Sequence, residues 1–181
     1  MDKKFNNKPN DLHLTSDGKE VWVSRSVAVN CLVIFQTKNI IPDYYILSEK
    51  RGSGLSDESG KWCFPCGYLD WNESAKEAAI REVFEETGLD LDYYLNIGKI
   101  IVNDLEQPWF VDSNPSSNRQ NVTLRHACII TDDKLPKITN KYSDPNEIEL
   151  LRWIELDELI EYDWAFGHDK IIREYLNKIW K

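Results

Sequence analysis

The sequence GYLDWNESAKEAAIREVFEETGL, residues 67–89, carries the strongest structural signal in this chain. Its second part predicts a helix over residues 73–87, because Asn72 can cap the start and Gly88 can adopt the left-handed conformation that ends a helix. Glu73 would lie at the positive end of the helix dipole. The residues that precede the helix are expected to form a loop that leads into it.

Three carboxylates share one face of this predicted helix. At about 100° per residue, Glu82, Glu85 and Glu86 lie together, away from the apolar stripe expected to pack on a sheet. That stripe comprises Ala79, Ile80, Val83 and Thr87. Many acidic helix faces are simply solvated, but Glu82 and Glu86 repel each other at i, i+4 unless a positive charge intervenes. Oxygen ligands at this spacing suit a hard cation such as Mg²⁺ or Mn²⁺, so both interpretations stand on spacing alone.

The helix and the loop before it together fit a longer motif. Gly67, Glu73 and the segment Arg81-Glu-Val-Phe-Glu-Glu-Thr-Gly-Leu89 match the Nudix box, G-x5-E-x7-R-E-U-x-E-E-x-G-U, in which U is a bulky aliphatic residue. The chain therefore resembles the Nudix hydrolases, at nine specified positions over 23 residues. The likeness extends weakly from about Ser26 to the C-terminus. It implies an α/β protein with the Nudix fold, an α/β/α sandwich with a central mixed β-sheet.

The resemblance assigns a metal site to the box. Glu82, Glu85 and Glu86 would hold Mg²⁺ or Mn²⁺, helped by the carbonyl oxygen of Gly67. The family reaction is attack of water on a phosphorus atom of a nucleoside diphosphate linked to a further group X. Such a reaction needs cations that neutralise the phosphate oxygens and a carboxylate that orients or deprotonates the water.

Further roles follow from the same resemblance. Arg81 and Glu73 would brace the loop against the helix, and Gly88 would be a structural position of the motif. The identity of the general base stays open among three glutamates, Glu82, Glu85 and Glu147. Glu147 precedes a late predicted strand, where it is equally well explained as an exposed loop acid.

Residues outside the box bear on the substrate. The segment from Asp112 to Val122 resembles the loop before a strand in ADP-ribose pyrophosphatase-like Nudix proteins. Trp109 could stack on a nucleobase, although a tryptophan more often fills a core. Guanidinium groups could bind phosphate or ribose oxygens. The candidate substrate-binding residues are Arg51, Trp109, Asp112, Arg119 and Arg125.

Composition predicts one domain with a polar extension. A chain of 181 residues with 41% hydrophobic content can bury one sizeable core. Residues 1–20 are polar and are expected to form an extension, with the Nudix domain over residues 21–181. The predicted strands cover residues 26–36, 44–48, 97–103, 122–131 and 149–154, and helical spacing recurs at 158–161 and 169–176. The proline-containing and polar stretch 108–115 predicts a long loop.

Charge, hydropathy and cysteine content exclude several classes of protein. A net charge of −9 argues against a nucleic-acid groove, which needs clustered Lys and Arg. No apolar run is long enough to span a bilayer, so we expect a soluble, cytoplasmic protein without a membrane partner. The four cysteines are too few and too scattered for a disulfide scaffold. The sequence leaves a homodimer possible.

The pair Cys63 and Cys66 has the C-x-x-C spacing of zinc and redox sites. Neither Cys31 nor Cys128 has a companion that could complete a zinc site, and a redox dithiol would lie at a helix start. In Nudix proteins W-x-F-P-G-G commonly leads into the box, so Cys63 fills the free position and Cys66 replaces the first glycine. We expect both thiols to be incidental.

Three functions remain in competition. The favoured one is a pyrophosphohydrolase that acts on ADP-ribose or a similar nucleoside diphosphate derivative. The second is a nucleoside triphosphate pyrophosphatase that removes unwanted nucleotides. The third is a nucleotide-binding regulator without hydrolase activity, which the complete set of box glutamates disfavours.

Overall fold

The computed structural model describes residues 10–114 and 121–181. In chain order its elements are β1 (Asp11–Leu14), β2 (Glu20–Val23), β3 (Val27–Gln36), β4 (Tyr44–Arg51), β5 (Trp62–Cys63), β6 (Cys66–Tyr68), α1 (Ala75–Thr87), α2 (Leu91–Asn96), β7 (Ile100–Asp104), β8 (Phe110–Asp112), β9 (Val122–Thr131), β10 (Ile148–Glu155), the 3-10 helices η1 (Leu156–Glu161) and η2 (Ala165–Gly167), and α3 (His168–Ile179). Among these residues, no helix combines the length and apolar character needed to cross a membrane.

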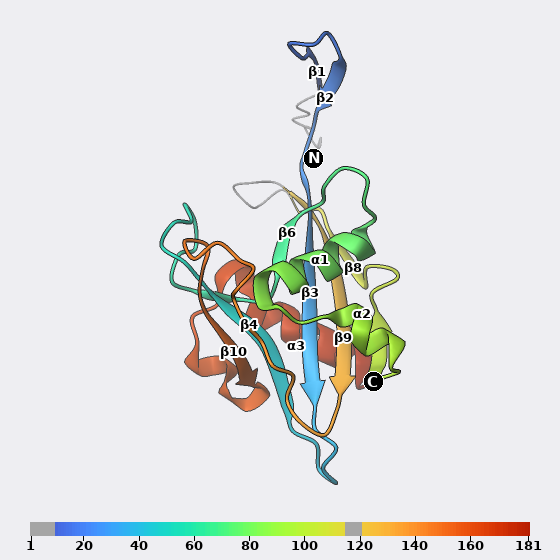
Figure 1. Ribbon diagram of the computed structural model, residues 1–181, viewed down its shortest axis with the longest axis vertical. Coiled ribbons are helices and arrows are strands. Elements are labelled where there is room, and N and C mark those ends of the chain that lie inside the picture. The colour runs from blue at the N-terminus through green and yellow to red at the C-terminus, as the bar shows by residue number, and fades with distance from the viewer. Residues whose placement is uncertain (1–9, 115–120) are drawn as a thin grey trace, which may run out of the picture.

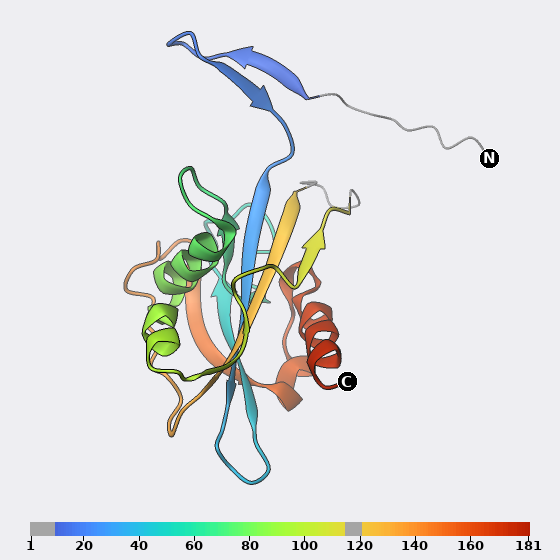
Figure 2. The ribbon, with the colours of Figure 1, turned by 90° about the vertical axis from the view of Figure 1, so that its right-hand side faces the viewer.

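A mixed sheet forms the middle layer of the molecule. Its strands run in the order β10-β4-β3-β9-β7, with β5, β6 and β8 paired to β4, β3 and β9. β3 and β9 are parallel along their whole lengths, from Val27 beside Val122 to Gln36 beside Thr131, and the other pairs are antiparallel. Helices α1 and α2 cover one face and α3 covers the other (Figures 1 and 2). This arrangement confirms the α/β/α sandwich with a mixed sheet.

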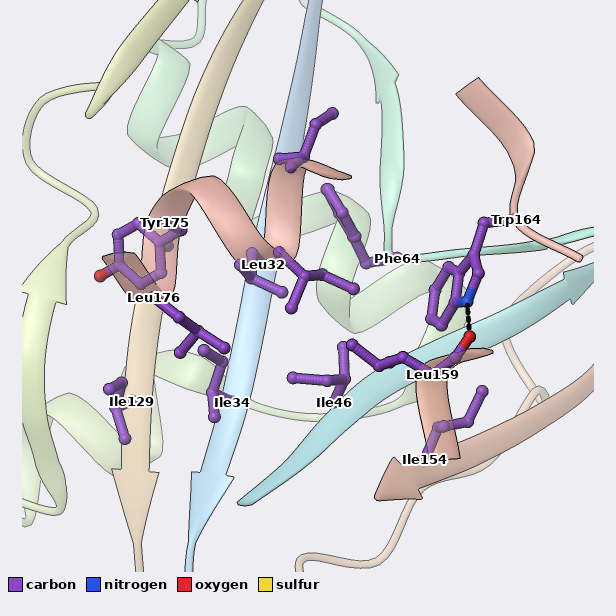
Figure 3. Packing of buried hydrophobic residues seen from close by; sticks show 13 residues of the cluster. Leu32, Ile34, Ile46, Phe64, Ile129, Ile154, Leu159, Trp164, Tyr175 and Leu176 are labelled. Atoms are coloured by element: carbon purple, nitrogen blue, oxygen red, sulfur yellow. Dashed lines mark hydrogen bonds between the residues drawn. The ribbon is translucent and has the colours of Figure 1, made fainter. Parts of the chain in front are cut away.

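Two apolar cores lie on the two faces of the sheet. On β3, Leu32 and Ile34 point toward α3, whereas Cys31 and Val33 point toward α1, because successive side chains of a strand alternate between faces. Figure 3 shows the core on the α3 side, where the indole of Trp164 donates a 2.8 Å hydrogen bond to the carbonyl of Leu159. Strands buried on both faces account for the nearly continuous apolar runs in the sequence.

The sheet opens into a fork beside α1. β3 pairs with β4 only from Ile34 to Gln36, so the first part of β3 and the last part of β4 diverge from each other. β5 fills the gap on the β4 side and β6 on the β3 side, where Gly67 lies opposite Val29. The C-x-x-C stretch is therefore part of the sheet. Cys66 has an extended backbone as the first residue of β6, so the glycine expected at this position is not needed.

Helix α1 agrees with the sequence at its end and differs at its start. Gly88 adopts φ +66° and donates its N–H to the carbonyl of Phe84, which confirms the expected termination. The cap is Ser74, which accepts the N–H of Glu77, so the expectation that Asn72 caps the helix was wrong. Asn72 instead has φ +66°, a turn conformation that glycine and asparagine tolerate best.

Several elements were absent from the sequence-based expectation. β8 lies inside the stretch expected to be a loop, and α2 follows α1 after only a short connection. β1 and β2 form a separate two-stranded hairpin that projects away from the sandwich (Figures 1 and 2). The short strands β5 and β6 lie where a loop was expected, whereas β3, β4, β7, β9, β10 and the helix α3 lie within a few residues of their predicted positions.

Candidate active site

Gly67 and Glu82 meet where β6 passes under α1. A Cβ atom at Gly67 would lie 2.1 Å from Oε1 of Glu82, far inside van der Waals contact. Any larger residue at this position would force the Glu82 carboxylate out of the place it occupies. The backbone of Gly67 and the Glu82 carboxylate, both expected in the metal site, are therefore neighbours.

Arg81 joins the helix to the loop that precedes it. Its Nη1 donates to Oε1 of Glu82 at 2.8 Å and to Oε2 of Glu85 at 2.9 Å. Its Nε and Nη2 donate to the two carboxylate oxygens of Glu73 at 2.9 and 2.8 Å, and Nη2 also reaches the carbonyl of Tyr68. The hydrogen bonds from Arg81 lower the pKa of Glu73, and those to Glu73 in turn raise the pKa of Arg81. The predicted brace between Arg81 and Glu73 has this geometry.

Two further carboxylates lie beneath the loop, Glu49 buried and Glu86 half-buried. Oε2 of Glu86 accepts the N–H of Cys66 at 2.9 Å, and Glu49 on β4 lies beside it. Burial raises the pKa of Glu86 well above its ordinary value and that of Glu49 to about 7. Burial likewise raises the pKa of Glu82, and this outweighs the opposing effect of Arg81. The Sγ of Cys63 donates to Oε1 of Glu49 at 3.2 Å, which leaves that thiol a packing and hydrogen-bonding role.

The donor set at this place fits a hard divalent cation. The carboxylates Glu82, Glu85 and Glu86 and the backbone of Gly67 offer only oxygen ligands, as Mg²⁺ and Mn²⁺ prefer. Within the described residues no three His, Cys, Asp or Glu side chains converge into a ready metal cluster. Glu82 and Glu85 instead contact the guanidinium of Arg81, which is the positive charge they share.

Three of the candidate substrate residues come together on the other face of the sheet. Arg125 on β9 forms an ion pair with Asp112 at 2.6 Å, lies 4.8 Å above the ring of Phe110 and reaches Glu174 of α3. Trp109 lies 6.0 Å from the same guanidinium and packs against the α3 core, so its ring is half-buried. Among residues 10–114 and 121–181, Nε of Arg125 and Nε1 of Trp109 are buried without a hydrogen-bond partner.

The other candidates lie elsewhere. Arg51 is buried, donates to the carbonyl and carboxylate of Asp57 and lies 4.8 Å from the ring of Phe166. Glu147 is exposed in the loop before β10, and its carbonyl accepts the N–H of Gly52 at 2.6 Å. Arg119 falls outside the described residues.

His168 packs at the start of α3. Its Nδ1 accepts the N–H of Phe64 at 3.2 Å, and the two rings stack with centroids 3.8 Å apart. Burial lowers the pKa of His168 to about 3, so the imidazole is neutral. His168 thus fastens α3 to the loop between β5 and β6.

Two buried polar residues of this region were missed in the sequence. Glu49 follows Leu47 on the face of β4 that points toward α1, and Asn30 lies on the face of β3 that points toward α3. Oε2 of Glu49 and Oδ1 of Asn30 have no hydrogen-bond partner within the described residues. A polar residue at an inward position of an otherwise apolar strand is the signal that could have identified both.

Comparisons with known proteins agree with the resemblance seen in the motif. The NUDIX domain family model matches residues 24–175. A curated relative from Danio rerio, "m7GpppN-mRNA hydrolase NUDT17", is 35% identical over 69 residues. These residues make up 38% of this chain and 22% of the relative, so the chain aligns with less than a quarter of that protein.

Solved structures share the fold at low identity. A bifunctional NMN adenylyltransferase/ADP ribose pyrophosphatase from Francisella tularensis, complexed with AMP and a manganese ion, superposes with a TM-score of 0.63 and 24% identity over 86% of this chain and 42% of that one. A MutT/nudix family protein from Listeria innocua gives 0.61 and 24%, over 85% of this chain and 93% of that one. Likenesses at this level establish the arrangement of the elements and leave the substrate open.

Proposed function

This chain belongs to the NUDIX domain family, and we propose that it is a Mg²⁺- or Mn²⁺-dependent pyrophosphohydrolase. It would cleave the diphosphate of a nucleoside diphosphate linked to a further group. The observation that carries the proposal is the contact between Glu82 and Gly67, with Arg81 and Glu86 tying the same helix and loop together. Family membership and the geometry of the box support the same chemistry.

Glu82, Glu85, Glu86 and the Gly67 carbonyl would hold the metal. The bound cation would neutralise negative charge on the diphosphate oxygens and lower the pKa of a coordinated water. Arg81 fixes the relative positions of helix and loop through Glu73 and Tyr68. The same guanidinium keeps Glu82 and Glu85 charge-compensated when no metal is bound.

A carboxylate must orient or deprotonate the attacking water. Two exposed acids have the access that this role requires, Glu85 on α1 and Glu147 in the loop before β10. We propose that Glu85 or Glu147 is the general base. Glu82 is a third candidate, but its carboxylate would be engaged in binding the metal. Comparing the pH profiles of kcat for Glu85→Gln and Glu147→Gln would identify the base, because only loss of the base removes the rise of kcat with pH.

We favour ADP-ribose or a related nucleoside diphosphate derivative as substrate. Support comes from Arg125, whose buried Nε has no partner in the part of the chain that the structure describes and lies beside the aromatic rings of Phe110 and Trp109. Such a group can bind ribose or phosphate oxygens while the rings contact a base. Asn30, opposite Arg125 in the β3/β9 register, offers on the same face an acceptor that no described residue pairs with. Asp112 orients the guanidinium, and Arg51 and Arg119 remain candidates for phosphate binding.

Two other substrate classes stay in consideration. A nucleoside triphosphate would need only the box and a base site. A capped dinucleotide is suggested by the Danio rerio relative, whose printed activity is hydrolysis of m7GpppN-mRNA. Both contain the phosphoric anhydride bond that the proposed chemistry breaks.

A substrate panel tests the proposal. ADP-ribose, NADH, a dinucleoside polyphosphate, a cap dinucleotide and nucleoside triphosphates would be assayed with Mg²⁺ and with Mn²⁺. We expect fastest release of AMP from ADP-ribose, and a fall of at least about 100-fold for Glu86→Gln with an unchanged circular dichroism spectrum. Glu161→Gln, at an exposed acid of η1, is the matched control. No turnover of any compound together with tight ADP-ribose binding would favour a regulator instead.

We also propose how the whole chain is organised and where it acts. Residues 1–20 would be an extension to a domain over residues 21–181, which works on small nucleotides in the cytoplasm without nucleic-acid or membrane partners. The net charge of −9 supports the proposal that nucleic acid is not a partner, because a nucleic-acid groove needs clustered positive charge. A homodimer is compatible with this organisation and is tested by light scattering.

A further inference from the structure

Glu49 is an acidic residue in a position built for an apolar one. It lies on β4, next to the center of the sheet, with Leu151 of β10 on one side and Cys63 of β5 on the other. Its side chain points to the face that Leu47 shares, which is the face covered by α1. The residue is 2% exposed.

The surroundings of Glu49 supply little that compensates its charge. Oε1 accepts one weak hydrogen bond from the Cys63 thiol at 3.2 Å, and Oε2 has no partner within the described residues. Arg51, two positions along the strand, pairs with Asp57 at 3.2 Å. The carboxyl group of Glu86 lies within hydrogen-bonding reach of it, and the charges of Arg51 and Glu82 act on it as well, in opposite directions.

The buried Glu49 and the half-buried Glu86 lie side by side, and their repulsion is relieved either by a proton held between them or by a cation. An unpaired buried carboxylate costs several kcal/mol, and a second one adds repulsion in a medium that screens it poorly. Metal ions relieve such clusters, because carboxylate oxygens are the preferred ligands of hard divalent cations. Glu86 already belongs to the proposed metal site, and Glu49 presents a free oxygen beside it.

We propose that Glu49 is a further metal-binding carboxylate, and that its Oε2 binds a divalent cation together with Glu86. The site thereby gains a ligand from β4, in addition to those from α1 and from the loop of Gly67. This inference rests on the proposed metal site of the box glutamates. It extends that site across the fork of the sheet, to a residue that lies outside the box.

The test measures Mn²⁺ binding directly. The full chain would be titrated with MnCl₂, and free Mn²⁺ followed by electron paramagnetic resonance, for the wild type, Glu49→Gln and Glu149→Gln. Glu149 is an exposed acid on β10 that pairs with Lys50, so its substitution removes one charge near β4 without touching the site. We expect Glu49→Gln to weaken Mn²⁺ binding at least about tenfold or to remove one bound ion, and Glu149→Gln to stay within about twofold.

Thermal unfolding without metal provides the second measurement. Glu49→Gln should melt at or above the wild-type temperature, because a neutral amide replaces a carboxylate beside Glu86, and its gain on adding Mn²⁺ should be smaller. If the variant does not fold, Glu49→Asp, which keeps the charge on a shorter arm, should show a loss of affinity of at least about threefold. Affinity unchanged in the folded variant would overturn the proposal and leave Glu49 as a protonated partner of Glu86.

The two levels of failure are separable. A wild-type chain that binds no Mn²⁺ would contradict the metal site itself and, with it, this inference. A wild-type chain that binds Mn²⁺ and hydrolyses a nucleotide, while Glu49→Gln binds the ion equally well, would contradict the role of Glu49 alone.

Discussion

At the scale of single residues, the site depends on Gly67, which has no side chain. The absence of a Cβ atom at Gly67 lets β6 approach Glu82, and the carboxylate occupies the space that the atom would take. A motif glycine is often explained by backbone conformation, but Gly67 does not have a positive φ. Here the reason is space, because a Cβ atom would displace the Glu82 carboxylate from its place against the strand.

Gly67→Ala should therefore destabilise the fold through its contact with Glu82. We expect a loss of about 1–3 kcal/mol in the free energy of unfolding, as for other overpacking substitutions. Urea denaturation without metal measures it. In a Glu82→Ala background the same change should cost far less, since the obstructing carboxylate is gone. An equal cost in both backgrounds would show that the contact is not the cause.

A second residue-scale prediction concerns His168 and pH. Burial lowers its pKa to about 3, so between that value and the unfolded pKa near 6.5 only the unfolded chain takes up the proton. This contribution to stability is complete above pH 6.5 and is lost as the pH falls toward 3, by about 1.4 kcal/mol per pH unit.

Urea denaturation at pH 7 and pH 5 tests this dependence. The wild type should lose about 2 kcal/mol more than His168→Asn between these pH values, because the variant has no imidazole to protonate. His13→Asn, at an exposed position of β1, serves as the control and should behave as the wild type. Equal losses in all three chains would mean that His168 is accessible to protons in the folded state.

At the scale of elements, the start of α1 is set by a capping box. Ser74 accepts the N–H of Glu77 at 3.3 Å, and the Glu77 carboxylate accepts the N–H of Ser74 at 2.7 Å. This pattern, Ser-x-x-Glu, was readable in the sequence two residues after the expected cap. Asn72 precedes Glu73, whose carboxylate pairs with Arg81, and both residues lie before the first turn of the helix.

Ser74→Ala should lower the free energy of unfolding by about 1 kcal/mol, the usual effect of losing a cap. Asn72→Gly is the contrasting variant. It should keep or slightly raise stability, because glycine adopts the observed φ of +66° without strain. Thermal and urea unfolding of both variants compare the two positions directly, and a larger loss for Asn72→Gly would restore Asn72 as the cap.

The divergence of β3 and β4 determines where the stretch before α1 lies. It brings β5 and β6 into the sheet, so the Cys63–Cys66 stretch delivers the Gly67 backbone to α1. The spacing of the two cysteines suggested a metal or redox site, but Cys63 is buried against Glu49 and Cys66 contributes its backbone N–H to Glu86. Their spacing follows from the strand geometry.

At the scale of the whole molecule, the sandwich and the N-terminal hairpin are distinct. Residues 10–14 and 20–21 are exposed, as are the side chains of Leu14 and Val23. The hairpin is a separate sheet from the central one. A lone two-stranded hairpin is marginally stable in water, so it adds little to the folding of the domain.

Deleting residues 1–23 should leave the sandwich folded, with the free energy of unfolding changed by less than about 0.5 kcal/mol. Urea unfolding and size-exclusion chromatography with light scattering would be compared for the full and shortened chains. A marked loss of stability, or a fall from dimer to monomer, would contradict this expectation and show that the hairpin packs on another surface.

The sequence by itself determined the layers of the fold, α1 and the glutamates of the box. Apolar periodicity, capping residues and motif spacing are properties of short segments, so they can be recognised in the sequence alone. Only the tertiary structure decided the contact of Gly67 with Glu82, the burial of Glu49 beside Glu86, and the grouping of Arg125 with Asp112. These contacts join residues from separate strands and helices, and their distances depend on how the fork and the parallel pair β3/β9 bring distant segments together.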